Sequence, residues 1–204
     1  VVMGGGDSSR FGYVCKSLVM YKGTFVISHV FKAVKDAGID YAVIKANEAN
    51  HEFIDHLARK YFERYGIVIG GKPQPMRYAI RELLEYLDGD FYLVVGNQPM
   101  PGDHLHQLGE AKKMGAELVV SLYRNEIAQS SRVVLDPNGR VKIAPEGQDN
   151  PIFYMQHPYI LSPSIVSLQE GESFNYKLEG TLSRNLNTQN VAGVEAPMPP
   201  EFDT

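Results

Sequence analysis

The chain has 204 residues, a formal net charge of −4, 44% hydrophobic and 22% charged residues, and a single cysteine. This composition is ordinary for a soluble globular protein with one good core, so we expect one domain over residues 1–204. The lack of a basic surface disfavours nucleic acid as a partner, and apolar runs stay well short of the roughly 18 residues that a membrane-spanning helix needs. One cysteine cannot form an intrachain disulfide, which fits the reducing cytoplasm. We therefore expect a cytoplasmic protein; the short apolar runs predict no membrane partner, and a homo-oligomer stays open.

Short apolar strands alternate with amphipathic helices over the first 122 residues. The expected strands are 1–3, 41–46, 66–69, 91–95 and 117–122, and apolar residues at helical spacing predict helices near 27–37, 53–61, 80–87 and 105–111. Such alternation is typical of a mostly parallel sheet with right-handed crossovers. Ligands of these sheets bind beyond the carboxyl ends of the strands.

The residues from 123 onward have a different pattern. The segment 132–143 reads as two strands joined by a strong hairpin turn at Asp136-Pro-Asn-Gly139. The segments 152–154 and 159–161 are also strand-like, and Pro163 opens a short helical pattern. We therefore expect a β-rich half at 123–204 that belongs to the same domain as the α/β half at 1–122.

A glycine-rich stretch follows the first predicted strand. Residues 4–12 read Gly-Gly-Gly-Asp-Ser-Ser-Arg-Phe-Gly, and Lys16 comes four residues later. Glycines let backbone N–H groups approach an anion closely, and Arg10 and Lys16 could neutralise its charge, which favours a phosphate site. Ser9 breaks the dinucleotide fingerprint, and the Gly-Lys-Ser/Thr of a P-loop is missing. The turn Gly96–Pro99 also follows a predicted strand and could face the same pocket, while a glycine-rich turn with solvated charges is the alternative.

Residues 4–16 resemble the signature Ala-Ala-Gly-x-Gly-Ser-Arg-Phe-Gly…Lys of the nucleotidyltransferases with the nucleotide-diphospho-sugar transferase fold. That group includes sugar-1-phosphate nucleotidylyltransferases and molybdenum-cofactor guanylyltransferases. Further segments resemble its later motifs in the same order, at 22–30, 35–39, 96–99, 133–143 and 159–163. The resemblance implies a Rossmann-like three-layer α/β sandwich with a mostly parallel mixed sheet and a small β-rich acceptor subregion. It makes 1–122 the nucleotide-binding half and 123–204 the acceptor-binding half.

The same resemblance implies an activity and a set of site residues. A nucleoside monophosphate would pass from a nucleoside triphosphate to a small phosphorylated acceptor, preferably a sugar 1-phosphate, with Mg2+ as cofactor and pyrophosphate as product. The nucleotide would be held by Gly5, Gly6, Ser8, Ser9 and Gln74, with Arg10 and Lys16 as catalytic cations. The acceptor would contact Glu146, Tyr154 and Tyr159, and the metal would contact Asn97 and Asp203.

The sequence departs from the pattern of these enzymes at several positions. Ser8 replaces a glycine of the loop, and Asn97 replaces the metal-binding Asp, which weakens a site for a hard cation. No Lys accompanies Glu146, and Asn187-Thr188 competes with Asp203-Thr204 for the C-terminal motif. Three alternatives therefore stay open: a molybdopterin or polyol-phosphate nucleotidyltransferase, a catalytically impaired nucleotide or nucleotide-sugar binding protein, and a structural or interaction domain.

Overall fold

The computed structural model describes residues 1–5, 15–70, 76–125, 131–145, 147, 152–166, 182, 186 and 189–197. The chain divides into two compact units. The first includes Val1–Gln74 and Leu93–His106, and the second includes Pro75–Tyr92 and Gln107–Met198. In the described part of the chain, no helix is long and apolar enough to cross a membrane.

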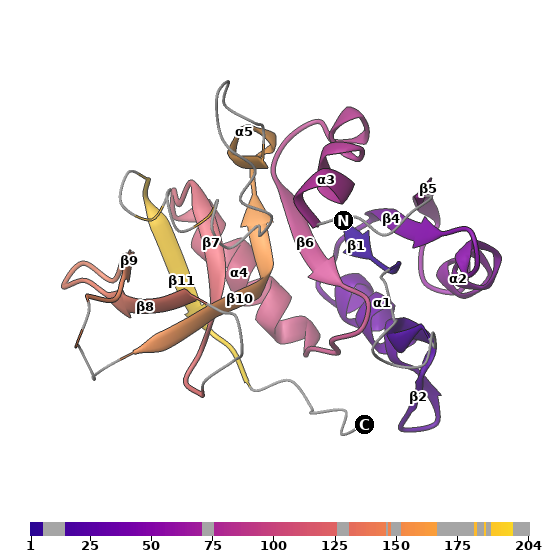
Figure 1. Cartoon of the computed structure of the whole chain (residues 1–204), viewed down its shortest axis with the longest axis horizontal. Helices are drawn as coiled ribbons and strands as arrows, with labels where there is room; N and C mark the ends of the chain where they lie inside the picture. The colour runs from indigo at the N-terminus through magenta and orange to yellow at the C-terminus, as the bar shows by residue number, and fades with distance from the viewer. Residues whose placement is uncertain are drawn as a thin grey trace. The chain divides into compact units, whose positions relative to one another are not determined.

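The first unit is built on a parallel sheet. Its strands are β6 (Phe91–Val95, entering this unit at Leu93), β1 (Val2–Met3), β4 (Tyr41–Asn47) and β5 (Arg64–Gly70), in that order. Each neighbouring pair is parallel, with Met3 beside Val95 on one side and Lys45 on the other. Figure 1 shows β1, β4 and β5 side by side. The parallel sheet predicted from the alternation is therefore confirmed.

Two amphipathic helices supply the core of this unit. α1 (Val26–Asp36) buries Ile27, Val30, Phe31 and Val34 on one face, the spacing of a helical stripe. α2 (His51–Ala58) buries Ile54, Leu57 and Ala58. Each fully buried aliphatic side chain of this kind stabilises the fold by about 1.5–3 kcal/mol. This core holds the N-terminal strand β1 in place, and with it the glycines that follow.

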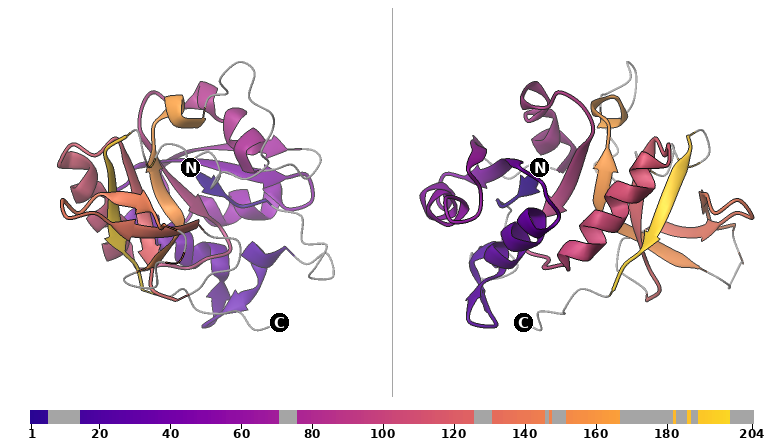
Figure 2. Two further views of the ribbon diagram at one scale, coloured as in Figure 1. Left: turned by 60° about the vertical axis from the view of Figure 1, so that its left-hand side comes forward. Right: turned by 180° about the vertical axis from the view of Figure 1, so that it is seen from behind.

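A short hairpin precedes α1 and was not predicted. It consists of β2 (Met20–Tyr21) and β3 (Thr24–Phe25), joined by Lys22 and Gly23 with φ angles of 46° and 82°. Two left-handed residues at a two-residue turn match the twist of a hairpin. Strands of two residues are too short to show an alternating pattern in the sequence. The hairpin extends away from the sheet at the start of α1 (Figure 2).

The second unit contains both antiparallel and parallel strand pairs. β10 (Phe153–Leu161) is antiparallel to both β7 (Leu118–Tyr123) and β8 (Ser131–Leu135), whereas β11 (Val191–Glu195) is parallel to β7. The predicted hairpin is confirmed as β8 with β9 (Val141–Ile143), and the Asp136 carboxylate accepts hydrogen bonds from the Asn138 and Arg140 amides at 2.8 and 2.9 Å. The fold class, a mixed and mostly parallel α/β sheet, is as expected.

Two local predictions differ from the structure. The two strand-like segments around Pro158 form the single strand β10, whose register shifts between Gln156 and Tyr159. Proline has no N–H for the ladder, so pairing is interrupted there without ending the strand. The helix expected near 80–87 is instead two elements, α3 (Met76–Arg81) and the 3-10 turn η3 (Leu84–Tyr86). The helical segment ends before Leu87, whose backbone is extended with φ −123° and ψ 116°. The remaining helices are α4 (Gly102–Lys113) and α5 (Pro163–Val166).

His157 of β10 gives the second unit a predictable acid sensitivity. The residue keeps some exposed surface, but its Nδ1 atom is buried and has no hydrogen-bond partner among the described residues. Burial lowers the pKa of His157 to about 4, from the model-compound value of 6.5. Between these two pH values the unfolded chain binds a proton that the folded chain does not, so stability falls as the pH falls.

We expect His157→Gln to remove this loss. Wild type should lose up to about 3 kcal/mol more unfolding free energy than the variant between pH 6.5 and pH 4, since each pKa unit corresponds to about 1.4 kcal/mol. Urea unfolding at a series of pH values measures the difference. His56→Gln, at an exposed position of α2, is the control and should keep the wild-type slope. Parallel curves for wild type and His157→Gln would contradict the assignment.

Candidate functional site

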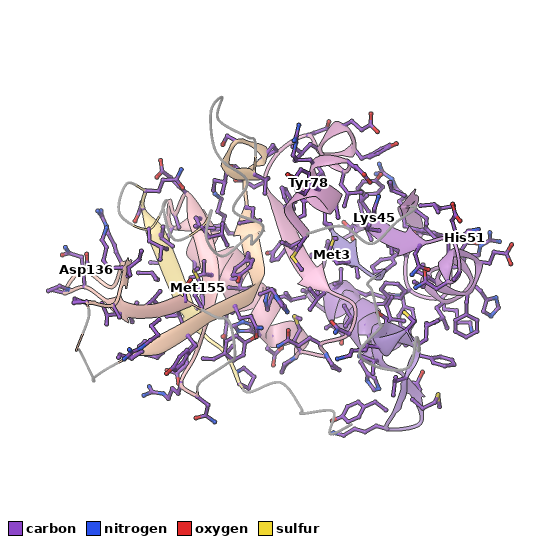
Figure 3. The ribbon with its side chains drawn as sticks, viewed as in Figure 1. Met3, Lys45, His51, Tyr78, Asp136 and Met155 are labelled. Atoms are coloured by element: carbon purple, nitrogen blue, oxygen red, sulfur yellow. The ribbon has the colours of Figure 1, made fainter. Side chains whose placement is uncertain are left out.

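Three strands of the first unit end at the same edge of its sheet. Gly4 and Gly5 follow β1, Asn47 ends β4, and Gly96 and Asn97 follow β6. These strands are parallel neighbours, so their carboxyl ends lie together. Figure 3 labels Met3 and Lys45, which are register partners one residue before this edge. The sequence expectation that 4–5 and 96–97 share one edge follows from this topology.

Glycine is required where these strand ends converge. The amides of Gly4 and Gly5 both donate to the Lys45 carbonyl, at 2.8 and 2.9 Å. A Cβ on Gly5 would lie 3.0 Å from backbone atoms of Ala46 and Asn47. A Cβ on Gly96 would lie 3.1 Å from the Cα of Gly4. Backbone is thus packed closely against backbone at this edge, with the Gly4 and Gly5 amides bound to the Lys45 carbonyl, and the glycine-rich loop continues from there.

A cation stands at the other flank of the glycine-rich loop. The 3-10 turn η2 (Lys16–Leu18) follows Cys15, and within it Ser17 is buried while Lys16 is exposed. The Ser17 hydroxyl donates to the Gly4 carbonyl at 3.1 Å. The turn is therefore tied directly to the end of β1. Lys16 is thereby held close in the chain to this edge, and its role as a phosphate-binding cation stays a prediction.

Three residues at this edge were not selected from the sequence. Lys45 is 4% exposed, and a Cβ on Gly70 would lie 3.0 Å from its Nζ atom, so glycine at that position makes room for the ammonium. Asn47 and Asn50 exchange hydrogen bonds between backbone amide and side-chain oxygen, at 2.9 and 3.0 Å. A lysine inside the apolar run 41–46 was the available signal for Lys45. The Lys45 side chain is the second cationic group, after Lys16, that the structure describes at this edge of the sheet.

The metal prediction rests on few described atoms. Asn97 is exposed directly after Gly96, where its amide oxygen could contribute one ligand. Among the residues that the structure describes, no group of three His, Cys, Asp or Glu side chains could hold a metal ion. Mg2+ commonly uses one or two carboxylates, substrate phosphates and several waters. The described residues therefore offer a cation at most the neutral oxygen of Asn97 at this edge.

The predicted site residues fall into three groups: those in the first unit, those in the second unit, and those outside the described residues. Gly5, Lys16 and Asn97 lie in the first unit, at or beside the carboxyl edge of its sheet. Tyr154 and Tyr159 lie on β10 of the second unit; Tyr154 is half-buried, and Tyr159 is fully buried with its ring 6.2 Å from that of His157. The others lie outside the described residues, so their roles stay predictions: Gly6, Ser8, Ser9, Arg10, Gln74, Glu146 and Asp203.

The fold is that of known nucleotidyltransferases. An inositol-1-phosphate CTP transferase from T. maritima has a TM-score of 0.74 at 16% identity, covering 95% of this chain and 83% of its own. A Bacillus anthracis protein assigned as a glucose-1-phosphate thymidylyltransferase, solved with a sucrose, has a TM-score of 0.78 at 12% identity, covering 98% and 86%. A UDP-glucose pyrophosphorylase complexed with UDP-glucose has a TM-score of 0.73 at 13% identity, covering 96% and 90%.

The chain belongs to the family of MobA-like NTP transferase domains, whose model matches residues 1–177. No curated protein sequence matches it. The structural neighbours are similar in fold alone, given their low identity. The resemblance that the loop 4–16 suggested is therefore confirmed at the level of the family and the fold.

Proposed function

We propose that this protein transfers a nucleoside monophosphate from a nucleoside triphosphate to a small phosphorylated acceptor and releases pyrophosphate. The observation that carries the proposal is the position of Lys16 beside Gly4 and Gly5 at the carboxyl edge of a parallel sheet. The start of a glycine-rich loop and a cation at one edge suit a polyphosphate. Membership of an NTP transferase family supports the same reaction.

The proposed reaction forms one P–O bond and breaks another. An oxygen of the acceptor phosphate attacks the α-phosphorus, and the bond from that phosphorus to the bridging oxygen of the β-phosphate breaks, so pyrophosphate leaves with the electron pair. The protein's work is positioning and charge neutralisation. Lys16, with Arg10, offsets the charge of the triphosphate, and the Gly5 backbone, with Gly6, Ser8 and Ser9, holds it. A Mg2+ ion would supply further positive charge, and Asn97 and Asp203 would hold it beside the phosphates.

A sugar 1-phosphate is the acceptor that we propose first. The structural neighbours include proteins named for glucose 1-phosphate, inositol 1-phosphate and UDP-glucose. Tyr154 and Glu146 would line the acceptor site, and Gln74 would read the base; Tyr159 is fully buried, so we do not propose a direct contact between it and the acceptor. The MobA-like family favours a molybdopterin phosphate as the second candidate, and the inositol enzyme favours a polyol phosphate. The free thiol of the single cysteine suits the cytoplasmic location that we propose.

A pyrophosphate-release assay tests the reaction. The protein is incubated with Mg2+, each of the four common nucleoside triphosphates, and in turn glucose 1-phosphate, inositol 1-phosphate and a molybdopterin phosphate. Release that requires both a triphosphate and one acceptor is the expected result. Triphosphate binding without pyrophosphate release in any combination would instead support a binding protein without turnover. The presence of Asn97 where these enzymes have a metal-binding Asp favours this as the second function.

Asn97→Asp should increase metal dependence. A carboxylate at this exposed position restores the charged oxygen that a hard cation prefers, so we expect the Mg2+ concentration for half-maximal activity to fall by about tenfold. Any residual turnover should rise with it. A Mg2+ titration of pyrophosphate release measures both quantities, and Asn138→Asp on the β8–β9 turn controls for added charge. Identical titrations for wild type and Asn97→Asp would place Asn97 away from the metal.

A further inference from the structure

Asn50 stands at the beginning of α2 but does not cap it. An Asn at this position ordinarily accepts a hydrogen bond from one of the first free amides of its helix. The Asn50 side chain makes no capping bond. Its Oδ1 atom accepts from the Asn47 amide at 2.9 Å, while its Nδ2 atom donates to the Gly4 carbonyl at 3.4 Å and to the Cys15 sulfur at 3.1 Å. The buried side-chain amide therefore joins segments that are far apart in the sequence.

These contacts hold both flanks of the segment 6–14. The Gly4 carbonyl, before that segment, accepts hydrogen bonds from Asn50 Nδ2, from the Ser17 hydroxyl at 3.1 Å and from the Cys15 thiol at 3.8 Å. We call Gly4, Cys15, Ser17, Asn47 and Asn50 the Asn50 cluster. Lys16 lies between two of its members, so the cluster sets the position of the Lys16 backbone relative to the amides of Gly4 and Gly5.

The cluster needs an amide at position 50 and cannot use a carboxylate. One side of the group faces the Asn47 N–H and must accept, while the other side faces the Gly4 carbonyl and must donate. Rotating the amide by 180° would place its NH2 group against the Asn47 N–H and its oxygen against the Gly4 carbonyl, so the network fixes its orientation. Aspartate has the same shape, and it is an equally good residue for the start of a helix, where negative charge is favourable. The substitution Asn50→Asp therefore disrupts the hydrogen bonds of the cluster while keeping a residue that suits the start of α2.

We propose that Asn50 is a positioning residue of the nucleotide site. Its side-chain amide holds Gly4 and Cys15 together and so sets the separation between the start of the glycine-rich loop at Gly4–Gly5 and the turn that carries Lys16. Asn50 acts through these groups and does not touch the reacting atoms. This inference rests on the proposed function for the ligand, but the cluster itself can be tested without one.

Asn50→Asp tests the proposal against a matched control, Asn138→Asp, which makes the same chemical change on an exposed turn. We expect Asn50→Asp to fold but to melt several degrees below wild type, because the helix start is kept while a buried carboxylate faces the Gly4 carbonyl. Its kcat/KM for nucleotidyl transfer should fall by about 10- to 100-fold, because misplacing a charged group by about 1 Å has costs of this size. Asn138→Asp should change neither quantity. Wild-type kcat/KM in Asn50→Asp would overturn the proposal.

Labelling of Cys15 with a chromogenic disulfide reagent gives a readout that needs no nucleotide. Cys15 is the single cysteine, so the signal has one source. In Asn50→Asp the donor beside the sulfur becomes a carboxylate that repels the thiolate, and we expect labelling at pH 7 to slow roughly tenfold. An unchanged rate would overturn the cluster, whereas a faster rate would show that the substitution releases Cys15 from it. If wild type binds no triphosphate, the proposed function fails, while this rate still decides whether Asn50 holds Cys15.

Where Asn50→Asp fails to fold, Ser17→Ala replaces it. That variant removes one of the donors to the Gly4 carbonyl and leaves α2 untouched. We expect it to lower kcat/KM several-fold with a folded melting profile, and in combination with Asn50→Ala the loss should be larger; wild-type kinetics in both variants would overturn the proposal.

Discussion

Replacing Lys16 with methionine should lower kcat/KM for nucleotidyl transfer by about 10²- to 10³-fold, the loss expected when one preorganised positive group at developing charge is removed. Lys16 is exposed, and methionine keeps most of its aliphatic length. The fold should therefore be unaffected, since surface substitutions usually change stability by less than about 0.5 kcal/mol. Steady-state pyrophosphate release and thermal melting measure the two quantities on the same preparation.

The control for Lys16→Met is Lys35→Met, which removes the same charge from an exposed position on α1. It should keep wild-type kinetics, because the loss is assigned to a position at the sheet edge and not to net charge. Equal activity of Lys16→Met and wild type would remove Lys16 from the site. A parallel fall in both lysine variants would show that overall charge, not position, determines the rate.

Gly5→Ala is the second substitution for which we expect a large effect. The new Cβ would meet backbone atoms of Ala46 and Asn47 at 3.0 Å, a distance that requires β1 and β4 to separate locally. Overpacking of this kind costs about 1–3 kcal/mol of stability. Because the start of the glycine-rich loop is displaced with β1, we expect triphosphate affinity to fall by about tenfold or more, measured by titration calorimetry.

Two matched alanine variants separate crowding from the loss of glycine itself. Gly4→Ala should be milder, because its Cβ would first meet the Cδ1 ends of the Ile27 and Ile54 side chains, at 3.2 Å, and would lie 3.3 Å from one backbone atom, the Lys45 oxygen. Gly89→Ala has nothing within 4 Å and should match wild type. The order Gly5, Gly4, Gly89 in loss of affinity is the expected outcome. Equal affinities across the series would mean that close backbone approach at β1 is not needed for binding.

The sequence predicted the sheet because hydropathy and glycine placement act locally. The apolar segments at 41–46 and 91–95 are buried strands, and the turn at Asp136–Gly139 carries its own hydrogen bonds. The edge of the sheet shared by Gly5 and Gly96 also followed, since topology alone places parallel strand ends together. These features depend on residues within one element or on the general handedness of α/β folds.

The Asn50 cluster could not be predicted in the same way. Asn50 lies 46 residues from Gly4 in sequence, and an Asn before a helix reads as an ordinary cap. Lys45 likewise sits in a buried run where pattern analysis expects only apolar side chains. Only tertiary structure shows that these polar groups meet at one sheet edge.

The central claim, that a nucleoside triphosphate binds beside Gly5 and Lys16, is tested most directly by melting the protein with each of the four common nucleoside triphosphates and Mg2+. A ligand that binds only the folded state at 100 times its Kd adds about 2.7 kcal/mol, so at least one triphosphate should raise the melting temperature by roughly 5 °C or more. The rise should be lost in Lys16→Met. No rise with any triphosphate, or an equal rise in Lys16→Met, would contradict the claim.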